Sequence, residues 1–309
     1  MIKSLLHWIL RLCFRYRAYN TEALTTPGPV LLLPNHVSWL DWAFLGVILD
    51  EDWKFVTSST TAETSWIHRK IMVNRRTFPI DPASPYGAKR MAEFLAKGGR
   101  LVLFPEGRLT RTTRMMKLFD GTGFLIHKTK AKVITCYLRN AVRVPAVRHT
   151  GWTQWFPKVS AHFSPLLTAP DLTHQPNAVA RTRITRWLRD AMVHQQFQAE
   201  MDHGPQDILE AIAETARTLP RRQVLEDITL KPLTYRRLMV GTELLAGQFR
   251  RCLPPAARSP QGDPAQVGVL LPNVNGMPVT LMALWATGHT PAVLNFSTGP
   301  TILLQCSQL

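Results

Sequence analysis

The sequence predicts an α/β domain with a mostly parallel mixed sheet flanked by helices. Strand-like and helix-like runs alternate from about residue 29 to 165, which is the pattern of a parallel sheet with helical crossovers. The best candidate strand, Val30-Leu31-Leu32-Leu33, is a continuous apolar run, as expected of a strand buried on both faces. The length of 309 residues fits one large domain or two ordinary ones.

An N-terminal helix is expected over residues 1–20. Its charged residues are all basic, and its apolar residues recur at helical spacing: Leu5, Leu6, Trp8, Ile9, Leu12, Cys13 and Tyr16. Arginines interrupt the apolar run, so a signal peptide fits poorly. A basic amphipathic helix with a tryptophan suits the interface of an anionic bilayer. The alternative is a helix packed on the core with its arginines in water, and the basic charge of the whole chain favours the membrane.

The elements of the central domain, residues 21–220, follow from apolar periodicity and from glycine and proline punctuation. Pro34 ends the first strand, and Gly98-Gly99 closes the helix before the strand 100–104. The expected strands are 30–33, 53–57, 75–82, 100–104, 132–138 and 159–163. The expected helices are 39–49, 65–73, 86–97, one opened by Gly121 and Gly123, 177–198 and 206–218.

A second, incomplete α/β segment is expected over residues 221–309. Leu219-Pro220-Arg221-Arg222 is expected to separate it from the central domain, and residues 252–264, rich in Pro, Ala and Gly, are expected to form a surface loop. A strand at 267–271, a helix at 279–286 and a short strand at 292–294 complete the pattern.

The net charge is the unusual feature of the composition. There are 37 Lys+Arg against 21 Asp+Glu, a formal net charge of +16, which indicates an anionic partner: nucleic acid or an anionic membrane. No zinc-ligand spacing, basic helix-turn-helix pattern or aromatic–glycine RNA motif occurs, so no nucleic acid partner is expected.

The four cysteines, Cys13, Cys136, Cys252 and Cys306, are scattered, so neither a disulfide framework nor a metal site is expected, and a reducing compartment fits. No apolar run reaches about 18 residues, the length a membrane-spanning helix needs. We therefore expect a peripheral or monotopic protein at the cytoplasmic face of the membrane.

Two polar loops follow expected strands. His36 and Asp41 come after the strand 30–33, and an acid five residues beyond a histidine can turn that imidazole into a general base. Phe104-Pro105-Glu106-Gly107-Arg108 follows the strand 100–104. Because parallel strands end at the same edge of a sheet, we expect both loops to line one crevice. Arg108, with Arg111 and Arg114, is suited to a phosphate.

These two motifs, NHxxxxD and FPEGR about 70 residues apart, resemble those of the glycerolipid acyltransferases of the 1-acylglycerol-3-phosphate type. The resemblance implies that His36 deprotonates a glycerol hydroxyl, which attacks an acyl thioester, with Asp41 orienting the imidazole. It implies substrate contacts from Asn35, Phe104, Pro105, Glu106, Gly107 and Arg108. It also implies no bound cofactor or metal, with acyl-carrier protein or acyl-CoA as the donor and membrane lysophospholipid as the acceptor.

The resemblance is closer to one branch, the bifunctional enzymes that join a 2-acylglycerophosphoethanolamine acyltransferase to an adenylate-forming acyl-carrier-protein synthetase. Residues 78–82, 105–108 and 116–124 carry it, and residues 233–238 and 267–295 resemble the start of the synthetase domain. The sequence holds no Ser/Thr/Gly-rich phosphate loop, so no ATP-dependent activation by this chain is expected. The alternative function is a non-catalytic basic lipid-binding module left from a truncated bifunctional protein.

One departure from the family concerns phosphate binding. Many members carry an arginine at the end of the strand between the two motifs, where this sequence has Asp81-Pro82. Arg75, Arg76 or Lys89 would then have to supply the cation.

Overall fold

The computed structural model describes residues 2–59, 69, 73–81, 84–149, 151–255, 266–295, 297 and 299. The expected helix 65–73 falls almost wholly outside these residues. The chain divides into two compact units, Met1–Gly204 and Pro205–Leu309.

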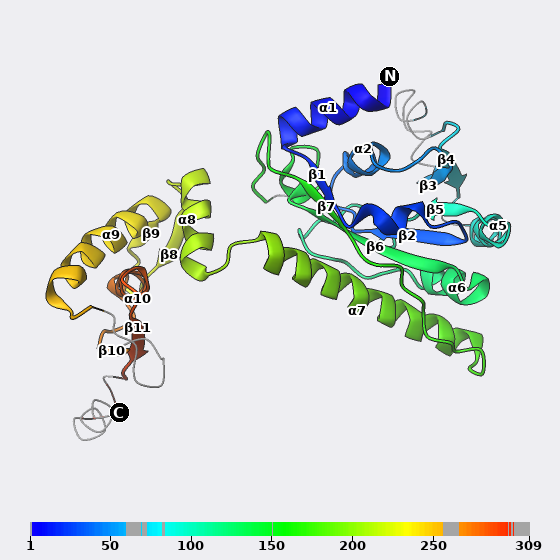
Figure 1. The fold of residues 1–309 in the computed structure, drawn as a ribbon. Helices are drawn as coiled ribbons and strands as arrows, with labels where there is room; N and C mark the ends of the chain where they lie inside the picture. Colours follow the sequence, from blue (N-terminus) through cyan, green and yellow to red (C-terminus); the bar gives the residue numbers. More distant parts are fainter. Residues whose placement is uncertain are drawn as a thin grey trace. The chain divides into compact units, whose positions relative to one another are not determined.

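The first unit is built on a seven-stranded sheet in the order β1-β7-β6-β2-β5-β3-β4 (Figure 1). The strands are β1 Arg17–Tyr19, β2 Val30–Pro34, β3 Trp53–Ser58, β4 Thr77–Ile80, β5 Arg100–Val102, β6 Lys132–Arg139 and β7 Ser160–Phe163. Strands β2 to β6 are mutually parallel, β7 is antiparallel to β6, and β1 is parallel to β7. The expected mostly parallel mixed sheet is confirmed.

Helices cover both faces of this sheet (Figure 1). They are α1 Ile2–Phe14, α2 Asp41–Gly46, α5 Pro85–Ala96, α6 Asp120–Thr129 and α7 Asn177–His203, with short 3-10 helices η1 Thr21–Thr25 and η2 Ala141–Arg143. Strand β2 is buried throughout. Its side chains alternate between two cores: Val30 and Leu32 join the core under α1 and α2, whereas Leu31 and Leu33 join the core under α5, α6 and α7. This burial on both faces explains why β2 reads as an unbroken apolar run.

The strand directions decide which loops share an edge. The carboxyl ends of β2, β5 and β6 lie at one edge of the sheet. Strands β1 and β7 run the opposite way, so their amino ends lie at that same edge: Arg17 pairs with Ser160, which pairs with Arg139 at the end of β6.

Helix α1 packs one side against α2. Leu10 is buried, the Tyr16 hydroxyl donates to the Phe44 carbonyl oxygen at 2.7 Å, and the Phe14 and Phe44 rings meet edge to face at 5.4 Å. None of the helices in the described part of the chain is both long and apolar enough to cross a membrane.

The second unit contains three helices and two small sheets among its described residues. Its elements are α8 Ile208–Thr218, β8 Gln223–Glu226, β9 Pro232–Thr234, α9 Tyr235–Cys252, β10 Gln266–Val269, α10 Gly276–Ala286 and β11 Thr290–Val293. Leu233, Leu238 and Met282 form its core. Because α8 packs with α9 and α10, the boundary expected after residue 220 falls inside this unit. Helix α9 was not among the predicted elements; Gly241 and Gly247 lower the helix propensity of its sequence.

Candidate active site

His36 and Asp41 are in direct contact at the carboxyl end of β2. The Nδ1 atom of His36 lies 2.9 Å from Oδ2 of Asp41. Asp41 begins α2, and its side chain reaches back to the loop that follows β2, where it contacts residues 36–38. The pairing expected from the five-residue spacing is therefore present, and it leaves Nε2 as the ring nitrogen that faces away from the acid.

Asp41 is wholly buried, and its Oδ2 atom accepts several hydrogen bonds from the loop. Besides the imidazole, Oδ2 accepts hydrogen bonds from the backbone N–H groups of Val37 at 2.8 Å and Ser38 at 3.0 Å. Burial raises the pKa of Asp41, while the hydrogen bonds from His36, Ser38 and Val37 oppose that rise. The three donors fix the carboxylate, and the carboxylate in turn fixes the imidazole.

The His36 ring is held on its other side by an aromatic ring from the second motif. Phe104 stacks on it with the ring centroids 4.0 Å apart and the planes 24° from parallel. The His36 side chain keeps 22% of its surface exposed. The imidazole is thus clamped between Asp41 and Phe104 and still accessible to a substrate.

Glu106 ties the two motif loops together. Its Oε1 atom accepts a hydrogen bond from the backbone N–H of His36 at 3.0 Å, and Oε2 accepts one from the backbone N–H of Met116 at 2.9 Å. The side chain is buried, which raises the pKa of Glu106 against the opposing effect of these two bonds. Both oxygens are engaged inside the protein, so we propose a positioning role for Glu106 in place of the expected substrate contact.

Replacing Glu106 with alanine is expected to destabilise the first unit. The backbone N–H groups of His36 and Met116 would lose their acceptor, at a cost of about 1–3 kcal/mol each. Urea unfolding should therefore show a loss of about 2–6 kcal/mol, with Glu106→Gln intermediate because one carbonyl acceptor remains. Glu93→Ala, at an exposed position on α5, is the matched control. A Glu106→Ala protein as stable as the wild type would contradict this role.

The other expected substrate contacts divide into buried and exposed residues. Asn35 is buried, and its Oδ1 atom accepts a hydrogen bond from the Leu138 N–H at 2.7 Å, which fastens the end of β2 to β6. Pro105 is also buried. Gly107 and Arg108 are exposed and stay candidates for substrate contact.

Gly107 has a conformation and a neighbour that favour glycine. Its φ is +62°, in the left-handed region, and an added Cβ would lie 2.5 Å from the Phe119 ring. The Phe119 ring, just before α6, therefore packs directly against the backbone of the motif loop at Gly107.

The cations proposed to replace the missing family arginine are not at this edge. Arg75 and Arg76 precede β4, at the amino end of the parallel strands, whereas His36 follows a carboxyl end. The Arg76 guanidinium donates to the carbonyl oxygens of Gly46, Leu49 and Asp50, and Arg75 pairs with Glu51. The expectation for these two arginines is therefore wrong: they bind the segment after α2. Lys89 is exposed on α5.

Sequence reasoning missed two further parts of the site. The Thr110 N–H donates to the His36 carbonyl oxygen at 3.0 Å, and Thr110 is fully buried. The segment after β6 also contacts the first motif, since the Ala146 carbonyl oxygen accepts from the Trp39 N–H at 2.9 Å. The Arg148 guanidinium lies 5.2 Å from the centre of the Trp39 ring. Because β2 and β6 are parallel, the segments that follow these two strands are expected at the same edge of the sheet.

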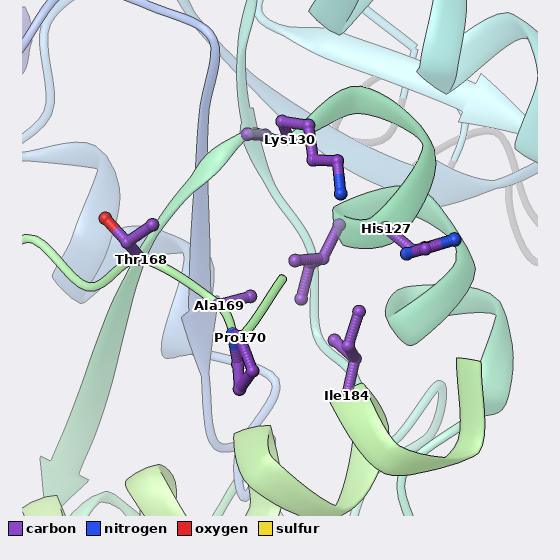
Figure 2. Close-up of a pocket in the computed structure, with 8 residues that line it drawn as sticks. His127, Lys130, Thr168, Ala169, Pro170 and Ile184 are labelled. Carbon is purple, nitrogen blue, oxygen red and sulfur yellow. The ribbon is translucent and has the colours of Figure 1, made fainter. Parts of the chain in front are cut away.

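Two small pockets lie in the first unit. One, of about 30 Å³, adjoins the motif loops and is lined by residues that include Asn35, Val37 and Glu106; its size suits bound water. The other, of about 40 Å³, is lined by His127, Lys130 and Ile184 among others (Figure 2). Lys130 precedes β6, so this second pocket lies at the sheet edge opposite to His36.

Comparison with known proteins gives a family match and a likeness to a solved structure. Residues 15–139 match the family model described as acyltransferase, a range that runs from β1 to the end of β6 and includes both motif loops. Among solved structures, the chain is similar to the 1-acyl-sn-glycerophosphate (LPA) acyltransferase PlsC from Thermotoga maritima, with 12% identity, a TM-score of 0.44, and coverage of 62% of this chain and 79% of that chain.

The first unit thus carries a domain that matches the acyltransferase family model, and this match supports an acyltransferase enzyme. The match contains every residue that we assign to the candidate active site between Asn35 and Arg108.

Proposed function

We propose that this protein is a lysophospholipid acyltransferase that moves an acyl chain from a thioester to a glycerol hydroxyl. The observation that carries the proposal is the His36–Asp41 pair, with Nδ1 held at 2.9 Å from the carboxylate and Nε2 directed away from it. Because Asp41 holds the proton on Nδ1, Nε2 is free to accept the proton of a substrate hydroxyl placed next to it. We propose 2-acylglycerophosphoethanolamine as the acceptor, from the resemblance of the motifs.

The reaction follows from that arrangement. Nε2 of His36 takes the hydroxyl proton as the oxygen attacks the thioester carbonyl carbon. The carbon–sulfur bond then breaks, and the departing thiolate takes the proton back from the imidazolium. Asp41 stabilises the imidazolium between the two steps. The thioester is already activated, so the reaction needs no further cofactor.

The donor and the acceptor both carry negative charge, and the site edge supplies cations. Arg108, Arg111 and Arg114 are exposed on the segment that follows β5. Guanidinium groups bind phosphate bidentately, so we propose that these arginines contact the acceptor headgroup. The donor is acyl-carrier protein or acyl-CoA, and an acidic carrier protein would suit the net charge of +16.

The location and the second unit complete the proposal. We propose that the enzyme binds the cytoplasmic face of the membrane peripherally through α1. We propose that the segment after the acyltransferase domain is the start of an adenylate-forming domain, as the resemblance of residues 233–238 and 267–295 implies.

A panel of lysophospholipids with both donor types tests the function. We expect diacyl product with lysophosphatidylethanolamine in mixed micelles, from acyl-carrier-protein or CoA thioesters, detected by mass spectrometry. Binding of the lysolipids without any acylation would instead favour the non-catalytic lipid-binding module.

A further inference from the structure

Helix α1 exposes a continuous apolar face. Leu5, Trp8, Ile9 and Leu12 follow the i, i+3, i+4, i+7 spacing of one helix face, and all four are exposed: Trp8 by 61% and Leu12 by 65%. The other side of the helix is the side that packs on α2. This helix therefore has two apolar faces, and only one has a partner within the described residues of the first unit.

A loop between β6 and β7 adds two exposed aromatic side chains next to the end of α1. Trp155 is 76% exposed and Phe156 is 60% exposed. The Phe156 ring lies 5.9 Å from the Phe14 ring at the end of α1, and the Val159 N–H donates to the Phe14 carbonyl oxygen at 3.0 Å. The two segments, far apart in the sequence, are thus fastened side by side. We call Leu5, Trp8, Ile9, Leu12, Trp155 and Phe156 the docking surface.

The topology puts the junction of these two segments beside the active site. Helix α1 leads into the amino end of β1, and the loop leads into the amino end of β7. Both amino ends lie at the sheet edge where β2 and β5 present His36 and Phe104–Arg108. The end of α1 and the loop therefore lie at the same edge of the sheet as the base.

The two segments that form the docking surface carry basic side chains and no acid. Residues 1–21 contain no acid, and neither do residues 121–170. Arg11, Arg15, Arg17, Arg148 and Lys158 are exposed in these two regions. Arginine and lysine beside tryptophan and leucine suit an anionic bilayer. A second copy of this chain would bring two basic rims together, so repulsion disfavours self-association.

We propose that the loop of residues 151–157 is a second bilayer contact, which acts with the outer face of α1 to dock the His36 edge on an anionic membrane. This inference rests on the proposed function for its lipid partner. Two contacts from different elements restrict the tilt of the domain more than a single helix does.

Vesicle binding by the full chain tests the second contact. Trp155→Ser/Phe156→Ser should lower partitioning onto vesicles of phosphatidylcholine with phosphatidylglycerol by about tenfold or more, because two aromatic side chains no longer enter the interface. Trp155→Ser alone, which leaves the Phe14–Phe156 contact in place, should lower vesicle partitioning by a smaller factor. Phe197→Ser, at a 61% exposed position on α7, is the matched control and should bind as the wild type does.

Wild-type affinity in the double variant would overturn the proposal, as would failure of the wild type to bind these vesicles. Conversion of a wild-type dimer to monomers by the same substitutions would also overturn it, because the surface would then be a self-association interface. Co-sedimentation needs no turnover, so the result is separate from acyl transfer measured in detergent micelles.

Discussion

His36→Ala is expected to reduce acyl transfer by about 10²–10⁴-fold, the usual contribution of a positioned general base. The loss should fall on the turnover number, because the side chain removed is the one that takes the proton. Initial rates of thiol release with lysophosphatidylethanolamine measure it. His194→Ala, at an exposed position on α7, should keep a rate within about twofold of the wild type, as surface substitutions usually do.

The His36 variant should stay folded, for a reason visible in the structure. Glu106 is bonded to the backbone N–H of residue 36, which alanine retains, so the link between the motif loops survives. Vesicle binding should also persist, since the docking surface is untouched. A variant that turns over near the wild-type rate would remove His36 from the role of base.

Asp41→Ala is expected to impair both stability and catalysis. The backbone donors of Val37 and Ser38 would lose their buried acceptor, at about 1–3 kcal/mol each, so the free energy of unfolding should fall by about 2–6 kcal/mol. Loss of the partner of Nδ1 also frees the imidazole tautomer, and we expect turnover to fall by about 10²–10⁴-fold. Urea unfolding and initial rates measure the two effects.

Asp41→Asn separates these two effects. The amide oxygen can still accept from the backbone, so stability should lie closer to the wild type than in Asp41→Ala, while turnover stays low because the amide carries no charge to stabilise imidazolium. An Asp41→Asn protein that is stable and fully active would show that the carboxylate is not needed by His36.

The sequence was sufficient for the central arrangement of the fold. The apolar run at 30–33 and the strand at 100–104 are each followed by a polar motif, and parallel strands place such motifs at one edge. In the structure, β2 and β5 are direct neighbours, so the motifs touch through the bond from His36 to Glu106.

Side-chain direction was the part that sequence reasoning missed. A motif gives no sign of whether a carboxylate points outward or inward, and Glu106 and Asn35 both point inward to backbone donors. The place expected for Arg76 was also wrong. Arg76 precedes β4 and lies at the amino end of that strand, whereas the two motifs follow the carboxyl ends of β2 and β5 at the opposite edge of the sheet. The predicted stripe of α1 combined residues from two faces, since Leu6, which packs against the core, and Leu12, which is exposed, are equally apolar in sequence.

The most direct measurement of the central claim counts both products of one reaction. Purified wild-type protein and His36→Ala are each given an acyl thioester and lysophosphatidylethanolamine, and free thiol and diacyl lipid are quantified together. We expect equal amounts of thiol and diacyl lipid from the wild type, and neither above background from His36→Ala. Thiol release without diacyl lipid, or equal product from the two proteins, would contradict acyl transfer with His36 as the general base.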